Sequence, residues 1–472
     1  MACSMRQQMQ RVKDDATALL SPGKIVEACN AAGHDWRVRE LPPGVLVGLM
    51  MAQVLHATSL RGALRAGQVD ATPTAYCKAK NRLPLDVIQR LVADLAEQAK
   101  EVIGQSPSQT PPSEDFRGKF RGKFRGHFPG PGRVVMVDGS SASMPDTPAL
   151  QMAFGQPGNV KAGCGFPVMH LLALFDQASG MIQDLLTHPG NTHDMAHACA
   201  LHPMLEEGDI LLGDRAFCSY AHLCLLLRDN LHGVLRVHQK QIVSFKPGRR
   251  CKRQLPKARR KDAPTSAYIK RLGRHDQLVD YHKPSERPAW MSEEQYTQLP
   301  GAIRVRELRY KIKAKRGRTR EVTIVTTLLD PREYPKDELA KLYQSRWEVE
   351  TRLWEFKQTL GANVLRSKSQ AGVLKDLWMH VLVFNLIRLL MLRCAGQRGG
   401  DPRRLSFIDA RDVLRYGVRD SINHPIPRLM YHAIRPGRDQ PRVIKRRKDC
   451  YSVMTRPRDA LRQALAKKEL AA

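Results

Sequence analysis

The sequence predicts an α/β protein in which strand-rich segments lie between two helical regions. Three observations lead to this prediction. Residues 1–105 carry apolar side chains at helical spacing, short apolar segments typical of strands follow from Arg133, and a further helical stretch begins near Lys336. With 472 residues, the chain is long enough for about three domains.

The chain is strongly basic, with 77 lysines and arginines against 46 aspartates and glutamates, and a formal net charge of +31. This excess indicates a polyanionic partner. Because the basic residues are spread through every segment, nucleic acid is favoured over an anionic membrane. The longest apolar run, residues 377–392, is interrupted by polar side chains, and the N-terminus lacks an apolar signal core. We therefore expect a cytoplasmic protein without a membrane span.

Residues 1–105 are predicted to form a helical DNA-binding domain. Residues 45–60 are mostly apolar, and residues 83–95 have leucine or valine at every fourth position. Between them, Thr72 can cap a helix and Pro73 suits its first position. This helix carries three cations, Lys78, Lys80 and Arg82. DNA contact and an ordinary solvated basic helix explain these cations equally well.

Residues 106–132 are predicted to be a basic linker. They contain FRGKFRGKFRGHF at 116–128, a tandem repeat that alternates phenylalanine with cations and glycine and cannot bury a continuous face. Such a segment can lie along phosphates and stack its rings on exposed bases. A repeat expansion without any role explains it equally well.

Residues 133–236 show the pattern of three strands, a helical stretch and a fourth strand. The segments are RVVMVDG, HLLALFD, MIQDLLTH, residues 195–205, and DILLGDRAF. This is the element order of the ribonuclease H-like fold, in which the first and fourth strands are neighbours. The apolar run 134–137 should be buried in a sheet, so that Asp138 emerges at its rim, and the same argument applies to Asp214.

Three further regions follow. Residues 237–325 are rich in lysine, arginine and proline and contain alternating segments such as IRVRELRYKI, which predict a β-rich insertion. Residues 326–395 are predicted to complete the domain that begins at residue 133, with one helix from Lys336 past Leu360 and an apolar helix over 373–392. Residues 396–472 form a basic C-terminal region, including KRRKDC and TRPRDALRQALAKKEL, that we expect to be partly disordered.

The first of these two helices carries a column of polar side chains. At about 100° per residue, four of them fall within an arc of about 60° and extend over roughly 20 Å. They are Tyr343, Arg346, Glu350 and Lys357. Glu348 and Glu355 should point away from this arc into solvent. The column matches a phosphate backbone with metal, although an ordinary salt-bridged helix face, with Arg346 and Glu350 paired, is the alternative.

The spacing of that column resembles the Tyr-Arg-Glu-Lys signature of transposases of the insertion sequence four family. Other segments resemble further parts of the family: VDGSSASMPDTPALQMAFG its first-aspartate segment, KAGCGFPVMHLLALFD the strands after it, and GDILLGDRAFCSY its second-aspartate segment. The resemblance covers roughly residues 72–388. It implies a ribonuclease H-like catalytic domain that is interrupted by a β-rich insertion between the second aspartate and the glutamate.

The resemblance implies a DNA transposase that binds the ends of an insertion sequence, cleaves there and transfers the 3′-OH ends into target DNA. Asp138, Asp214 and Glu350 are then the catalytic residues, holding two Mg²⁺ ions about 4 Å apart, with Mn²⁺ as a substitute. The expected partners are the terminal inverted repeats and target DNA, bound by a dimer in a synaptic complex associated with the nucleoid. The residues expected to contact DNA are Tyr343, Arg346, Lys357 and Arg215.

One family feature, an insertion tryptophan that stacks on a flipped base, has only Trp290 as a candidate within residues 237–325.

Rival functions are a repressor descended from a transposase, which need not keep the three acids, and a ribonuclease H-like nuclease or resolvase, which need not have the polar column. A zinc hydrolase is suggested by His193 and His197, four residues apart, but that motif needs glutamate where Asp194 stands. The ten cysteines include no Cys-x-x-Cys pair, so neither a zinc knuckle nor a disulfide framework is predicted.

Overall fold

A computed structural model gives the fold of the chain. It describes residues 20–37, 39–105, 132–158, 160–190, 195–312, 320–398, 400–416, 429–430, 454 and 456–469. The FRGK repeat of the predicted linker, His193 and the KRRKDC segment lie outside these residues.

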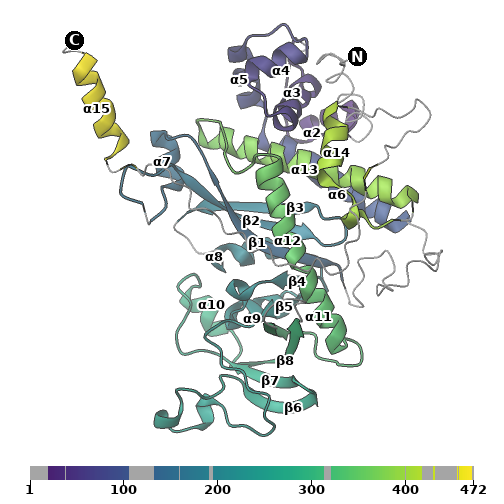
Figure 1. Cartoon of the computed structure of the whole chain (residues 1–472), viewed down its shortest axis with the longest axis vertical. Coiled ribbons are helices and arrows are strands. Elements are labelled where there is room, and N and C mark those ends of the chain that lie inside the picture. Colours follow the sequence, from purple (N-terminus) through teal and green to yellow (C-terminus); the bar gives the residue numbers. More distant parts are fainter. Residues whose placement is uncertain are drawn as a thin grey trace.

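A nine-stranded sheet runs through the protein (Figure 1). Its strands are β1 (Val134–Ser143), β2 (Val168–Asp176), β3 (Ile182–Pro189), β4 (Ile210–Gly213), β5 (His232–Arg236), β6 (Ala267–Gly273), β7 (Asp276–His282), β8 (Ala302–Ile312) and β9 (Arg320–Thr326). They lie in the order β3-β2-β1-β4-β5-β9-β8-β7-β6. The strands β1, β4 and β5 are parallel, whereas β2 and β3 are added antiparallel at one side and β6 to β9 at the other.

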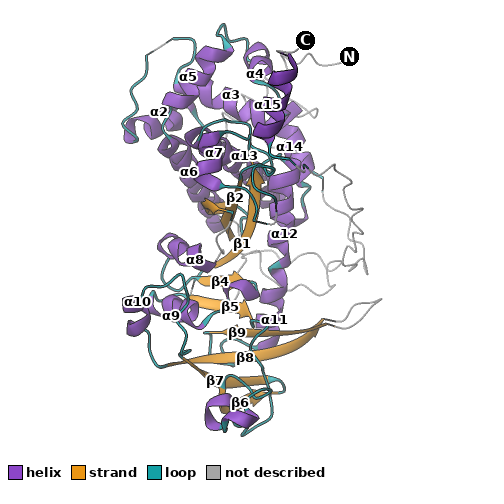
Figure 2. Ribbon diagram, turned by 90° about the vertical axis from the view of Figure 1, so that its left-hand side faces the viewer, coloured by secondary structure: helices purple, strands orange, loops and turns teal. Residues whose placement is uncertain are grey.

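The described residues form fourteen helices, some of which cover the two faces of this sheet (Figure 2). They are α2 (Pro22–Ala31), α3 (Pro43–His56), α4 (Leu60–Ala66), α5 (Pro73–Arg82), α6 (Leu85–Gln105), α7 (Pro148–Phe154), α8 (Met195–Ala198), α9 (Tyr220–Arg228), α10 (Glu293–Gln298), α11 (Lys336–Ser345), α12 (Trp347–Trp354), α13 (Gln370–Arg398), α14 (Phe407–Tyr416) and α15 (Arg458–Glu469). Alternate β1 residues face opposite cores. Met136 packs in the core that contains side chains of α11, α12 and α13, whereas Val137 packs in the core that contains those of α9.

The N-terminal helices share the first of these cores. Thr72 caps α5 as predicted, because its Oγ1 accepts a hydrogen bond from the backbone of Ala75 at 3.1 Å. The prediction that Lys80 projects into solvent is wrong. Lys80 is buried, forms an ion pair with Asp376 of α13 and donates to the hydroxyl of Ser367 at 3.0 Å. This cation therefore joins the N-terminal helices to α13, and of the three cations of α5 Lys78 and Arg82 are exposed.

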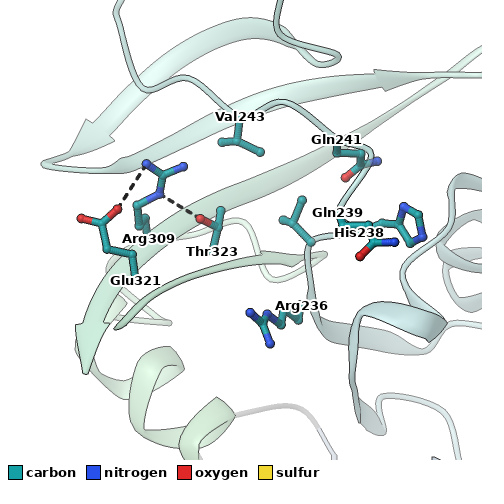
Figure 3. A pocket seen from close by; sticks show the side chains of 9 residues that line it. Arg236, His238, Gln239, Gln241, Val243, Arg309, Glu321 and Thr323 are labelled. Atoms are coloured by element: carbon teal, nitrogen blue, oxygen red, sulfur yellow. Dashed lines mark hydrogen bonds and ion pairs between the residues drawn. The ribbon is translucent and has the colours of Figure 1, made fainter. Parts of the chain in front are cut away.

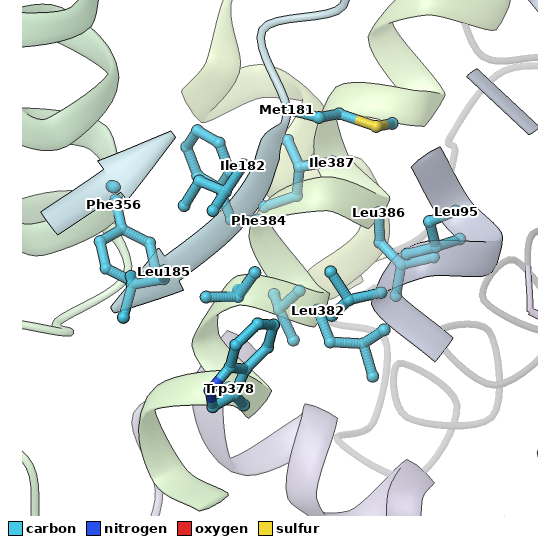
Figure 4. Packing of buried hydrophobic residues seen from close by; sticks show 14 of the residues in the cluster. Leu95, Met181, Ile182, Leu185, Phe356, Trp378, Leu382, Phe384, Leu386 and Ile387 are labelled. Atoms are coloured by element: carbon cyan, nitrogen blue, oxygen red, sulfur yellow. The ribbon is translucent and has the colours of Figure 1, made fainter. Parts of the chain in front are cut away.

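The long helix α13 is the centre of the larger core (Figure 4), where Phe384 and Ile387 lie near Ile182 of β3 and Phe384 also packs against Phe356, two residues after the end of α12. Residues 370–396 are long and apolar enough to cross a membrane, but 89% of the most apolar window is buried inside the protein. Polar residues of this helix also have partners. The Asn385 side chain accepts from the backbone N–H of Ile182 at 3.0 Å and donates to the carbonyl of Ile182 at 2.9 Å.

Replacing Asn385 by leucine is expected to lower the free energy of unfolding by about 1–3 kcal/mol. The apolar side chain cannot satisfy the buried N–H and carbonyl of Ile182, so both would lose their partner. Urea unfolding followed by circular dichroism measures the change. An unchanged midpoint would mean that these two backbone groups find other partners.

The stretch predicted to be a β-rich insertion continues the main sheet. Its last strand, β9, pairs with β5, placing Leu235 opposite Val325. Trp290, the candidate for base stacking, is partly buried and packs against the core on the α9 side, near Met291 and Tyr296. In this structure Trp290 therefore contributes to the core rather than presenting its ring to a base.

One prediction about the later helices needs correction. The helix that begins at Lys336 is not continuous past Leu360, because α11 ends at Ser345, Arg346 separates it from α12, and Glu355–Thr359 is π-helical. In the C-terminal region, which is predicted to be partly disordered, one segment forms the helix α15. Its first residue, Arg458, donates to the carbonyl of Gly165 at 2.9 Å.

Candidate active site

The two predicted aspartates lie on neighbouring parallel strands. The register pairs Val134 with Ile210 and Met136 with Leu212. Continued along both chains, it brings Asp138 opposite Asp214. Contrary to prediction, Asp138 does not end its strand. β1 continues to Ser143 against β2, and the strand that ends at this level is β4.

Backbone hydrogen bonds orient both carboxylates. Asp138 Oδ1 accepts from the N–H of Gly139 at 2.9 Å. Asp214 Oδ1 accepts from the N–H of Ala216 at 2.7 Å and so caps the 3₁₀ helix Arg215–Phe217. Each aspartate thus uses one oxygen for local structure, as expected of rigidly placed ligands.

The beginning of α12 brings Glu350 to the same place. The guanidinium of Arg346 lies between two of the acids, with Nη2 at 3.1 Å from Glu350 Oε1 and Nη1 at 3.8 Å from Asp138 Oδ2. Arg346 is buried beside the ring of Trp347, 5.1 Å from its centroid, whereas the side chain of Glu350 is 49% exposed. The guanidinium therefore bridges Asp138 and Glu350.

The charge balance of the site favours a further cation. Burial, together with the negative charges of Asp214 and Glu350, raises the pKa of Asp138 to about 6. The hydrogen bond from Gly139 and the charge of Arg346 act in the opposite direction. A divalent cation would relieve the repulsion among the three carboxylates, and their oxygen atoms suit the hard ions Mg²⁺ and Mn²⁺. The residues present therefore fit the metal that the sequence implies.

The remaining members of the predicted column differ in position. Tyr343 is buried, its hydroxyl has no hydrogen-bond partner among the described residues, and burial raises its pKa to about 12. Lys357 lies in the π-helical segment, where i→i+5 bonding turns the chain by less than 100° per residue. The angle predicted for Lys357 from a regular α-helix therefore does not apply. Burial lowers the pKa of Lys357. Arg215 is exposed directly after Asp214.

The prediction that Glu348 and Glu355 face solvent is wrong. Glu348 Oε2 accepts from Arg352 Nη2 at 2.9 Å, and Glu355 forms an ion pair with Arg388 of α13. Arg352 is itself buried and donates to the carbonyl of Gln177, after β2, at 3.0 Å. These pairs fix α12, and with it Glu350, against the sheet and α13.

A further cation beside the aspartates was missed in the sequence. Gly213 pairs with Leu235, so the next position of the register brings Arg236 beside Asp214. Arg236 is exposed and lines a cavity of about 190 Å³ together with His238 and Arg309 (Figure 3). The signal was present in the segment HGVLRV, whose apolar run ends in a cation.

Comparison with known proteins identifies the family of the chain. A family model described as the transposase DDE domain matches residues 129–386, which is more than half of the 472 residues. The chain belongs to this transposase family. The matched region contains all three predicted acids and the whole polar column.

Two individual proteins are similar to this chain. A segment of 146 residues is 31% identical to "Transposase InsG for insertion sequence element IS4" of Escherichia coli (strain K12), and it spans 30% of each chain. Together with the family model, this match confirms the relation to insertion sequence four that the Tyr-Arg-Glu-Lys spacing predicted. The structure of a piggyBac transposase synaptic complex with hairpin DNA aligns with a TM-score of 0.40 and 10% identity, over 85% of this chain and 78% of that chain.

Proposed function

We propose that the protein is a DNA transposase that binds the ends of its insertion sequence, cleaves there and joins the 3′-OH ends to target DNA. The observation that carries this proposal is the convergence of three acids, since Asp138 is within electrostatic reach of both Asp214 and Glu350. Membership of the transposase DDE domain family supports it. The net charge of +31 suits double-stranded DNA as the partner.

The domain organisation is part of the proposal. The order β3-β2-β1-β4-β5, antiparallel for the first three strands and parallel from β1 to β5, supports a ribonuclease H-like catalytic domain over residues 133–236 and 326–395. We assign residues 237–325 to the insertion, 1–105 to a helical DNA-binding domain, 106–132 to a linker and 396–472 to a basic C-terminal region. We also propose that it acts in the bacterial cytoplasm as a dimer on paired DNA ends.

In the proposed mechanism, Asp138, Asp214 and Glu350 would hold two Mg²⁺ ions, with Mn²⁺ as a substitute. The metal ions would activate the attacking water or 3′-OH and stabilise the leaving oxygen in an in-line displacement. The chain itself supplies positioning and charge. The backbone bonds to Gly139 and Ala216 fix the two aspartates, and the pairs made by α12 fix the glutamate.

Cationic and phenolic groups around the acids are proposed to bind the DNA phosphates. Arg346 already pairs with Asp138 and Glu350, and its Nε is buried without a partner among the described residues, as is the hydroxyl of Tyr343. Both groups are hydrogen-bond donors, and they would reach phosphate oxygens only if DNA binding exposes them. We place Arg215, Arg236 and Lys357 along the path of the same DNA backbone.

The experiment mixes the purified full chain with Mg²⁺ and linear DNA carrying the terminal sequences of its insertion sequence, and scores both cleaved and joined products. Joined products at the terminal sequences, and none with scrambled ends, are expected of a transposase. Cleavage without joining would support a nuclease or resolvase instead. Binding of the terminal sequences without any reaction would support a repressor.

The raised pKa of Asp138 leads to a prediction for the protein without metal. Because the folded-state pKa of about 6 exceeds the ordinary value near 4, this carboxyl stabilises the fold fully only below about pH 4 and loses that contribution as the pH rises through 6. Replacing Asp138 by asparagine should therefore raise the stability at pH 8 by the order of 2 kcal/mol and by less at pH 5. Thermal unfolding in EDTA at both pH values measures this, and an equal effect at both would contradict the burial argument.

A further inference from the structure

A second cluster of metal-ligating side chains lies on the sheet face opposite α12. Cys199 and His202 lie on the 3₁₀ helix Cys199–Met204, and His222 lies on α9. One ligand atom from each residue lies within 4.8 Å of the other two. Both histidines are buried and Cys199 is partly buried. The neighbouring Leu201 and Leu223 belong to the core on that face.

The hydrogen bonds of the two histidines leave their Nε2 atoms facing each other. His202 Nδ1 lies 2.9 Å from Asp229 Oδ2, and His222 Nδ1 lies 2.7 Å from the carbonyl oxygen of Phe217. Both partners are acceptors, so each Nδ1 must carry the proton. In neutral rings, the two Nε2 atoms then present lone pairs to each other at 3.0 Å. This contact is repulsive unless a proton or a metal ion lies between them.

Burial disfavours the proton. Burial, together with the neighbouring His202, lowers the pKa of His222 to about 4. The pKa of His202 is also lowered by burial, in spite of the opposing effect of Asp229. Neither ring is therefore expected to be charged near pH 7 in the absence of metal. A metal ion that accepts both lone pairs removes the repulsion without requiring a buried imidazolium.

We propose that Cys199, His202 and His222 bind a Zn²⁺ ion. A thiolate with two imidazoles is a ligand set that zinc prefers, and the fourth tetrahedral position is left for water. Asp229 and the Phe217 carbonyl hold the two rings by their other nitrogen, as in many zinc sites. On binding, the thiol proton of Cys199 is released to the solvent.

The ion would hold together segments that flank Asp214. The 3₁₀ helix that carries Cys199 precedes β4, and α9 follows the turn Arg215–Phe217 that Asp214 caps. The zinc would thus brace that turn through His222 and the carbonyl of Phe217. Its role is structural, and it is independent of the proposed transposase activity. The sequence contains the signal as Cys-x-x-His, whereas His197 of the HDMAH segment instead stacks on His188 with centroids 4.2 Å apart.

Cobalt spectroscopy on the full chain tests the proposal. The protein is stripped with a chelator, titrated with Co²⁺ and scanned for thiolate-to-cobalt charge transfer and for the visible bands of a tetrahedral ion, which Zn²⁺ should then abolish. In wild type, both signals should saturate at about one equivalent of Co²⁺ bound at this cluster. Replacing Cys199 by serine should remove the charge-transfer band and weaken binding more than about 100-fold.

Two control variants make the result specific. Cys224→Ser changes another buried cysteine, on α9, and should keep both signals. Glu350→Gln changes the carboxylate site and should also keep them. Because Cys199→Ser can lose stability for other reasons, His222→Gln provides a second variant of the cluster. Addition of Zn²⁺ should raise the melting temperature of the stripped wild-type protein, but not that of Cys199→Ser or of His222→Gln. Absence of a thiolate band in wild type, or its survival in Cys199→Ser, overturns the proposal and leaves a proton-sharing histidine pair.

Discussion

Replacing Glu350 by glutamine is expected to slow both cleavage at the element ends and joining to target DNA by about 10²–10⁴-fold. The change keeps the shape of the side chain but removes one of three negative charges proposed to hold the metal ions, whose stabilisation of the transition state amounts to several kcal/mol. The half-exposed position of Glu350 makes a folding defect unexpected. Single-turnover rates on DNA with the terminal sequences measure the effect.

Binding and a second substitution separate chemistry from other effects. Glu350→Gln should bind the terminal DNA about as well as wild type. Glu338→Gln, on the preceding helix α11, removes a partly exposed glutamate paired with Lys341 and should leave both reactions unchanged. Equal slowing by the two substitutions would point to a disturbed helix. A Glu350→Gln protein that still joins DNA at the wild-type rate would exclude Glu350 from the proposed metal site.

The elements with local signals were the most predictable. Unbroken apolar runs marked the buried parts of β1 and β4, a threonine before a proline marked the start of α5, and four side chains at fixed spacing identified the family. Apolar periodicity and capping chemistry act over a few residues, so sequence alone contains them. The catalytic roles of Asp138, Asp214 and Glu350 remain predictions.

Features that depend on distant partners were missed or mistaken. Asp138 lies within β1 because β2 supplies backbone partners as far as Ser143, although the sequence after Asp138 is rich in serine and glycine. Lys80, Glu348 and Glu355 look like solvated charges, yet each pairs with an oppositely charged side chain from the same or another helix. Local periodicity places a side chain on a face but does not say what covers that face.

Replacing Arg306 by methionine is expected to lower the free energy of unfolding by about 3–5 kcal/mol. Arg306 of β8 is fully buried, donates to both carboxylate oxygens of Asp276 at 2.8 and 2.6 Å, and donates to the carbonyl of Tyr334 at 2.7 Å. The substitution would leave the buried charge of Asp276 without a partner. Chemical unfolding measures the loss.

The same strand offers a matched control for this pair. Arg304 lies two residues earlier, on the same face of β8, and forms a similar two-point pair with Asp280, but its side chain is 51% exposed. Arg304→Met should therefore change stability little, because solvent already screens that pair. Removing both buried charges with Arg306→Met and Asp276→Leu should recover much of the loss, since the cost comes from the unpaired carboxylate. Because Arg306 also holds the segment that leads into α11, the single variant should slow DNA joining as well, whereas Arg304→Met should not.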